Sequence, residues 1–120
     1  MTRELEDEET RALRADLEAL RDQLCGFLEV SRDGSRPVEL EESIGRLSRM
    51  DALQQQSMAK ANRTAAEQRL ERVEAALRRV AADEYGPCLR CDEPVGFQRL
   101  KAQPEAVLCI ACQSRRERSA

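Results

Sequence analysis

Four of the five cysteines in this 120-residue chain form two C-x-x-C pairs, and this spacing restricts the fold more than any other feature. Cys88 and Cys91 form the first pair, and Cys109 and Cys112 form the second. Two residues between thiolates let one tight turn direct both sulfur atoms to one ion, and two such pairs complete a tetrahedral zinc site. Because sulfur would occupy all four positions, we expect one structural zinc ion with no open position for catalytic water.

The alternative interpretation of a C-x-x-C pair is a dithiol redox centre. Such a centre normally lies at a helix start in a thioredoxin-like sheet fold, and the sequence lacks the strand pattern of that fold. Cys25 lies outside both pairs, beside Gly26. We expect it to be a small buried apolar residue, and its role stays open.

The composition argues against a compact enzyme. Charged residues make up 36% of the chain and aromatic residues only 2%, so little material is available for a large core. The chain has no histidine, and it shows neither a serine nucleophile motif nor a glycine-rich phosphate loop. The abundance of Leu, Ala, Glu and Arg is typical of long helices or coiled coils. An elongated, non-enzymatic protein is therefore expected.

The first third of the chain predicts a helix over about residues 3–30. Its apolar residues alternate in steps of four and three, which is the seam of a helix packed along another helix: Leu13, Leu17, Leu20, Leu24 and Phe27. Asp33, Gly34, Ser35 and Pro37 then supply turn chemistry. We expect the tip of a helical hairpin near residues 31–38, or, in an alternative placement, extending to residue 52.

A second helix is predicted from Val38, with Pro37 at a favourable first position, to the region before Tyr85-Gly86-Pro87. Its seam is clearest in the later half: Ala66, Leu70, Val73, Leu77 and Val80. The predicted fold is mainly α: an antiparallel helical hairpin (coiled coil) over residues 1–82, then a small four-cysteine zinc-finger module over 83–120. We expect the module to have an irregular connection between the cysteine pairs and a short C-terminal helix beginning near Ile110.

Three basic residues near the cysteines are candidates to support the metal. Four thiolates around one zinc ion leave excess negative charge, which Arg90, Arg99 and Lys101 could offset. The alternative is that these residues are ordinary surface charges.

Three segments of the C-terminal region resemble the DksA/TraR zinc-finger family: Tyr85–Cys91, Arg99–Pro104 and Leu108–Cys112. The resemblance is good over residues 70–118 and weaker over the rest, where family members also have a helical hairpin. It implies a bacterial transcription regulator that binds RNA polymerase rather than promoter DNA and inserts its coiled-coil tip through the secondary channel. In that family acidic tip residues act near the active-site magnesium, and some members work together with ppGpp.

The sequence departs from the family at the tip. The signature of two aspartates three residues apart followed by alanine is not intact. Asp51 and Ala52 are a possible remnant, and the turn itself offers only Asp33. The alternative for each of the three is a solvated helix or turn residue.

Two other kinds of partner are weighed against polymerase. The same zinc-capped hairpin could be an interaction module for a different protein, which the altered tip would favour. The basic tail (Arg115, Arg116 and Arg118) could bind nucleic acid, but the formal net charge of −3 disfavours phosphate binding, so we expect no sequence-specific DNA binding. The acidic N-terminus is unlike a secretory signal, and no apolar stretch is long enough for a membrane span, so a cytoplasmic location is expected.

Overall fold

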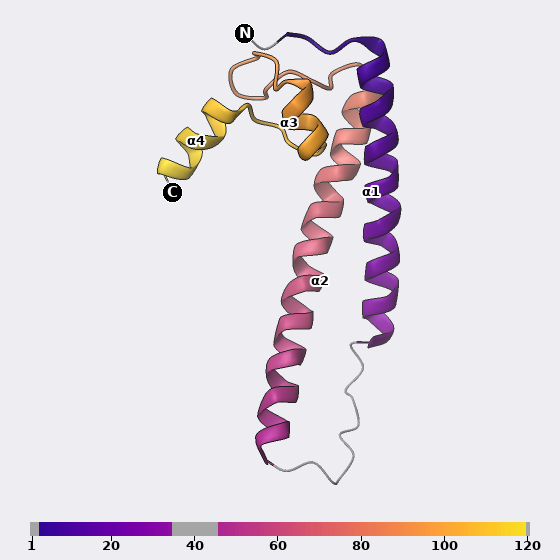
Figure 1. Ribbon diagram of the computed structural model, residues 1–120, viewed down its shortest axis with the longest axis vertical. Helices are drawn as coiled ribbons and strands as arrows, with labels where there is room; N and C mark the ends of the chain where they lie inside the picture. Colours follow the sequence, from indigo (N-terminus) through magenta and orange to yellow (C-terminus); the bar gives the residue numbers. More distant parts are fainter. Residues whose placement is uncertain (1–2, 35–45, 120) are drawn as a thin grey trace.

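Two antiparallel helices lie side by side along the longest dimension of the molecule, which is 61 Å (Figure 1). The computed structural model describes residues 3–34 and 46–119. Helix α1 spans Asp7–Gly34, and helix α2 spans Arg46–Ala81. The predicted helical hairpin is confirmed.

The C-terminal region folds into a small module beside one end of this hairpin (Figure 1). It contains two short helices, α3 (Phe97–Ala102) and α4 (Ile110–Ser119). Across the two described ranges no β-strand forms, and the pairing is limited to an isolated antiparallel bridge between Pro87 and Pro94. The mainly α fold class is confirmed, and α4 begins at the predicted residue.

Helix α1 continues beyond its predicted end. It ends at Gly34 rather than near residue 30, so Asp33 and Gly34 belong to the helix and not to a turn. The remainder of the predicted tip, residues 35–38, and the predicted start of the second helix at Val38 lie outside the described residues.

Among the hairpin residues whose side chains the structure describes, the fully buried ones lie near the module. Leu17 on α1 and Val73 and Ala76 on α2 are fully buried against one another. Toward the opposite end of the hairpin several large apolar side chains are exposed: Phe27, Val30, Met50, Leu53 and Met58. The two helices therefore share a firm seam at one end and carry uncovered apolar surface at the other.

Two expectations for α1 side chains are wrong. Phe27, predicted in the seam, is 44% exposed, and Cys25, predicted to be buried, is also exposed. The half-buried apolar residues after Leu20 on α1 are Leu24 and Leu28 instead. An α-helix has 3.6 residues per turn, so a strict 3.5-residue pattern drifts around its surface, and the contact stripe moves from position 27 to position 28.

The core of the module reaches onto the hairpin through α1. Leu13 is fully buried in a cluster with residues of the module: Cys88, Val95, Leu100, Leu108 and Cys112. Helix α3, which lies within the predicted irregular connection, contributes Leu100 to this cluster. Within residues 3–34 and 46–119, no helix combines the length and the apolar character that crossing a membrane requires.

Candidate metal centre

The first cysteine pair lies on a tight turn closed by backbone hydrogen bonds. The Cys88 N–H donates to the Glu93 carbonyl at 2.7 Å, and the Asp92 N–H donates to the Cys88 carbonyl at 3.0 Å. Asp92 has a φ of 63°, a left-handed conformation that aspartate tolerates better than most residues. This turn directs both sulfur atoms of the pair to the same side.

The second pair is positioned by the start of helix α4. Cys109 directly precedes α4, Cys112 lies in its first turn, and the Gln113 N–H donates to the Cys109 carbonyl at 2.9 Å. The partial positive charge at a helix N-terminus favours thiolates there. A bond from the Leu89 N–H to the Val107 carbonyl, at 2.9 Å, joins the two turns.

The structure brings the four predicted ligands together. All four Sγ atoms lie within 4.8 Å of one another, and the Cys91 and Cys109 sulfurs are 3.8 Å apart. A tetrahedron with Zn–S bonds of about 2.3 Å has sulfur–sulfur edges of about 3.8 Å. The donor set and its spacing therefore fit one zinc ion. Cys88 and Cys112 are buried, whereas Cys91 is exposed, so one side of the centre faces solvent.

The pKa values of Cys88 and Cys112 are shifted in opposite directions. Burial raises the pKa of Cys88, but hydrogen bonds from the backbone of Cys109, Arg90 and Cys91 outweigh it and lower the pKa to about 6. Hydrogen bonding to Cys109, together with burial, raises the pKa of Cys112 to about 12. Backbone N–H groups thus favour negative charge at Cys88, and four thiolates so close together need a cation to offset their charge. A zinc ion held by the four cysteines would supply that positive charge, and its binding would release thiol protons.

The three basic residues expected near the metal have different surroundings. Arg99 donates from Nε to the Leu108 carbonyl at 2.9 Å and so holds the residue before Cys109. Lys101 instead pairs with Asp16 of α1, with 2.9 Å between Nζ and Oδ2. Arg90 is exposed on the first turn.

The sequence did not reveal two contacts of the module: one lies within it, and the other joins it to the hairpin. The Tyr85 hydroxyl donates to the Pro104 carbonyl at 2.8 Å. Arg69 of α2 forms an ion pair with Glu105, whose side chain is only 2% exposed. Tyr85 is the one tyrosine of a chain nearly free of aromatic residues, and this rarity could have marked it as a structural residue. Glu105 offered no comparable signal, because a single glutamate in a highly charged chain does not stand out.

The predicted tip residues lie far from the cysteines along the hairpin. Asp51 and Ala52 lie near the start of α2, at the end of the hairpin opposite the module (Figure 1). Asp51 is exposed and Ala52 half-buried, and exposed Met50 and Leu53 flank them. Asp33 lies in the last turn of α1.

Comparison with known sequences identifies the module. The family model described as prokaryotic dksA/traR C4-type zinc finger matches residues 84–118, which include all four cysteines. The chain is 38% identical over 53 residues to the RNA polymerase-binding transcription factor DksA of Haemophilus influenzae. It is 41% identical over 49 residues to the protein of that name from Caulobacter vibrioides.

These sequence matches span only a part of each protein. The first covers 44% of this chain and 37% of the Haemophilus protein, and the second covers 41% and 34%. The structural likeness is more extensive. Transcription factor DksA2 from Pseudomonas aeruginosa superposes with a TM-score of 0.79 at 25% identity, over 95% of this chain and 87% of that one. The similarity in fold therefore includes the hairpin as well as the zinc module.

Proposed function

The chain belongs to the DksA/TraR C4-type zinc-finger family, and from this membership we propose that it is a DksA-like transcription regulator that binds RNA polymerase. The observation that carries the proposal is the extent of the fold match. The likeness to DksA2 covers 95% of the chain, so this protein has the hairpin of that transcription factor and not merely a related zinc finger. The names of the curated relatives supply the partner.

In the proposed mechanism the module is a rigid base and the hairpin is an arm that enters the secondary channel of polymerase. Zinc, when bound, crosslinks the two cysteine turns. Residues Leu13 and Leu17 fix α1 at the base, so the opposite end of the arm projects at a defined angle. The exposed apolar residues at that end, such as Met50 and Leu53, are of the kind that protein partners cover.

The protein would act by shifting populations of polymerase–promoter intermediates, which requires a different affinity for each state. In this proposal Asp51, Ala52 and Asp33 act at the tip, no bond is made or broken, and ppGpp is a candidate co-regulator. The site of action is the bacterial cytoplasm. The altered tip favours a second candidate function, a zinc-capped interaction module for a partner other than polymerase.

Binding to purified core polymerase distinguishes these two functions. The zinc-loaded protein is labelled at exposed Cys25, and its anisotropy is followed as polymerase is added, with and without an unrelated secondary-channel factor. We expect micromolar or tighter binding that the competitor displaces. Absence of binding at micromolar concentrations would reject the polymerase proposal, and binding that the competitor leaves unchanged would reject the channel as its site.

A further inference from the structure

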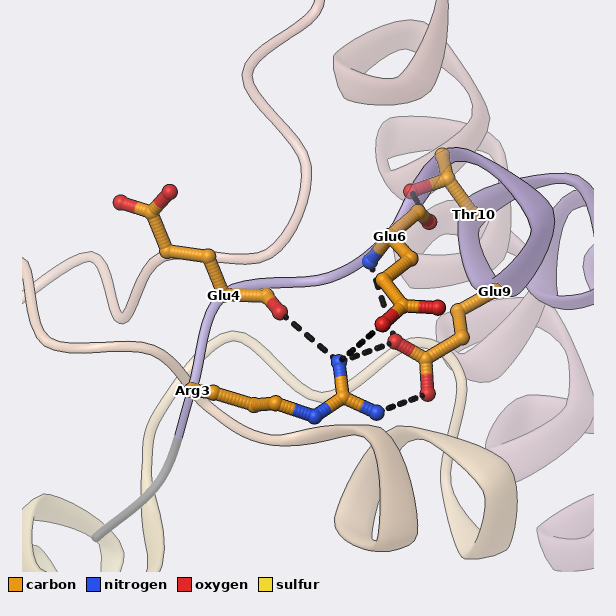
Figure 2. Close-up of polar contacts among 5 residues, drawn as sticks. All are labelled: Arg3, Glu4, Glu6, Glu9 and Thr10. Carbon is orange, nitrogen blue, oxygen red and sulfur yellow. Dashed lines mark hydrogen bonds and ion pairs between the residues drawn. The ribbon is translucent and has the colours of Figure 1, made fainter.

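The segment before α1 is held in a hook by one arginine. Arg3 donates from both terminal nitrogens to the two carboxylate oxygens of Glu9, at 2.6 and 2.7 Å, and from Nη1 to the Glu4 carbonyl at 3.1 Å (Figure 2). The Glu9 carboxylate also accepts the Glu6 N–H at 3.0 Å, as in the carboxylate half of a helix capping box. The bidentate pair therefore joins the segment to the first turn of α1.

This hook directs Leu5 onto the zinc module. Leu5 is half-buried against the core cluster that contains Cys88 and Cys112. It also approaches Gly86 so closely that a Cβ atom there would lie 3.3 Å from Leu5 Cδ1. The segment thus contacts the turn that leads into the first cysteine pair.

The positive charge of Arg3 favours the contact between residues 3–9 and the zinc module. Arg3 is the one basic residue among residues 3–9, which otherwise carry five carboxylates. A cavity of about 250 Å³ between the segment and the module has Glu4 and Asp7 on one side and Asp83 and Asp92 on the other. The segment and the module thus carry charge of the same sign at this cavity, and Arg3 is the one positive charge of the segment that offsets it.

We propose that residues 3–9 form a latch, closed by the Arg3–Glu9 pair, that holds the zinc module against the hairpin and slows its local opening. Opening the latch uncovers the Gly86 turn and the buried Cys88 that follows it, while the hairpin stays folded. This device would control how long the module keeps its metal and its orientation, and it is independent of the identity of the partner.

The test compares two arginines with the same exposure. Arg3 and Arg14 are each 60% exposed and each pairs with a glutamate of α1, but the Arg3 partner is 13% exposed and the Arg14 partner 44%. In the zinc-loaded protein, amide exchange is measured at Val95, whose N–H donates to the Gly86 carbonyl, and at Leu17 in the hairpin. Zinc loss to an excess of chelator is timed in parallel.

We expect Arg3→Met to speed Val95 exchange and zinc loss by about two- to fivefold, with no change at Leu17. Arg14→Met should change neither rate. Leu5→Ala should act in the same direction and more strongly, by about tenfold, because it removes the apolar contact itself. If Leu5→Ala unfolds the module but not the hairpin, that result supports the latch. Unchanged rates in Arg3→Met, or an equal effect of Arg14→Met, would overturn it.

Discussion

Arg69 and Glu105, which are 36 residues apart in the chain, form an ion pair with 2.5 Å between Nε and Oε2. The two partners differ in burial, because the Arg69 side chain is 41% exposed and the Glu105 side chain is 2% exposed. The second carboxylate oxygen of Glu105 has no hydrogen-bond partner among the described residues. Arg69 is thus the main compensation for a carboxylate buried between the module and α2.

This asymmetry predicts unequal effects of the two substitutions. Arg69→Met leaves the buried carboxylate without its cation and should lower the free energy of unfolding by about 3 kcal/mol. Glu105→Gln removes the charge but keeps a polar group near Arg69, and should cost only about 1 kcal/mol. Urea unfolding of the zinc-loaded variants, followed by circular dichroism, measures both values.

Arg63→Met is the matched control, since Arg63 lies on the same helix and pairs with exposed Glu67 at 3.8 Å. It should change the stability by less than about 0.5 kcal/mol. If Arg69→Met is no more destabilising than Arg63→Met, the buried pair does not hold the module in place.

The zinc site predicts that the module depends on its metal and that the hairpin does not. Cys88→Ser removes a buried thiolate, and structural zinc sites contribute about 10 to 16 kcal/mol of apparent binding energy at neutral pH. We expect this variant to lose its zinc and its module structure while α1 and α2 retain most of their helical signal. Metal analysis and circular dichroism, before and after chelation, provide the measurement.

Cys25→Ser is the control for loss of a thiol. Cys25 is exposed on α1, outside the cluster, so this variant should keep one zinc ion per chain. A Cys88→Ser protein that still held one equivalent of zinc in a protease-resistant module would contradict the ligand assignment.

Tyr85 predicts a loss of stability at alkaline pH. Burial raises the pKa of its phenol above the ordinary value of 10.0, partly opposed by Arg79. The unfolded chain therefore ionises first, so the contribution of the neutral phenol is complete below pH 10.0 and is lost as the pH rises toward the native pKa. As the only tyrosine in a chain without tryptophan, it can be titrated by tyrosinate absorbance.

The same titration in denaturant should give the ordinary tyrosine pKa. Tyr85→Phe, which keeps the packing but loses the bond to the Pro104 carbonyl, should cost about 1 kcal/mol and abolish this part of the alkaline loss. Ionisation of native Tyr85 at the ordinary value would show that the phenol is not held as the structure describes.

Asp51 predicts a separation of binding from regulation if the proposed function is correct. Asp51→Asn keeps the shape of an exposed residue near the start of α2 and removes its charge. We expect polymerase affinity to change little, whereas the effect on transcription from a responsive promoter in vitro should fall by about tenfold, equivalent to about 1.4 kcal/mol.

Glu71→Gln, an exposed charge on the same helix nearer the module, should leave both properties unchanged. Asp33→Asn tests the other tip placement. If the Asp51→Asn variant still regulates transcription fully and the Asp33→Asn variant does not, the residue that acts at the tip lies at the end of α1 and not on α2.

The sequence alone was sufficient for the parts of this protein that depend on short-range spacing. Two residues between cysteines determine how a turn can present sulfur, so the four zinc ligands follow from the spacing of the cysteines. Apolar residues spaced by three and four determine which face of a helix is buried, and Leu13, Leu17 and Val73 are buried as that pattern predicts.

Only the tertiary structure decided how the two parts are joined. Lys101 forms an ion pair with Asp16 instead of lying against the metal site, and Glu105 is buried beside Arg69. Both results depend on which residues distant in the chain come into contact. The same is true of the hook that brings Leu5 to Gly86. An ion pair between residues 36 or 85 positions apart leaves no mark in the local sequence, unlike a pair four residues apart on one helix. The role of each of these charged side chains therefore depends on the partner that the tertiary structure places beside it.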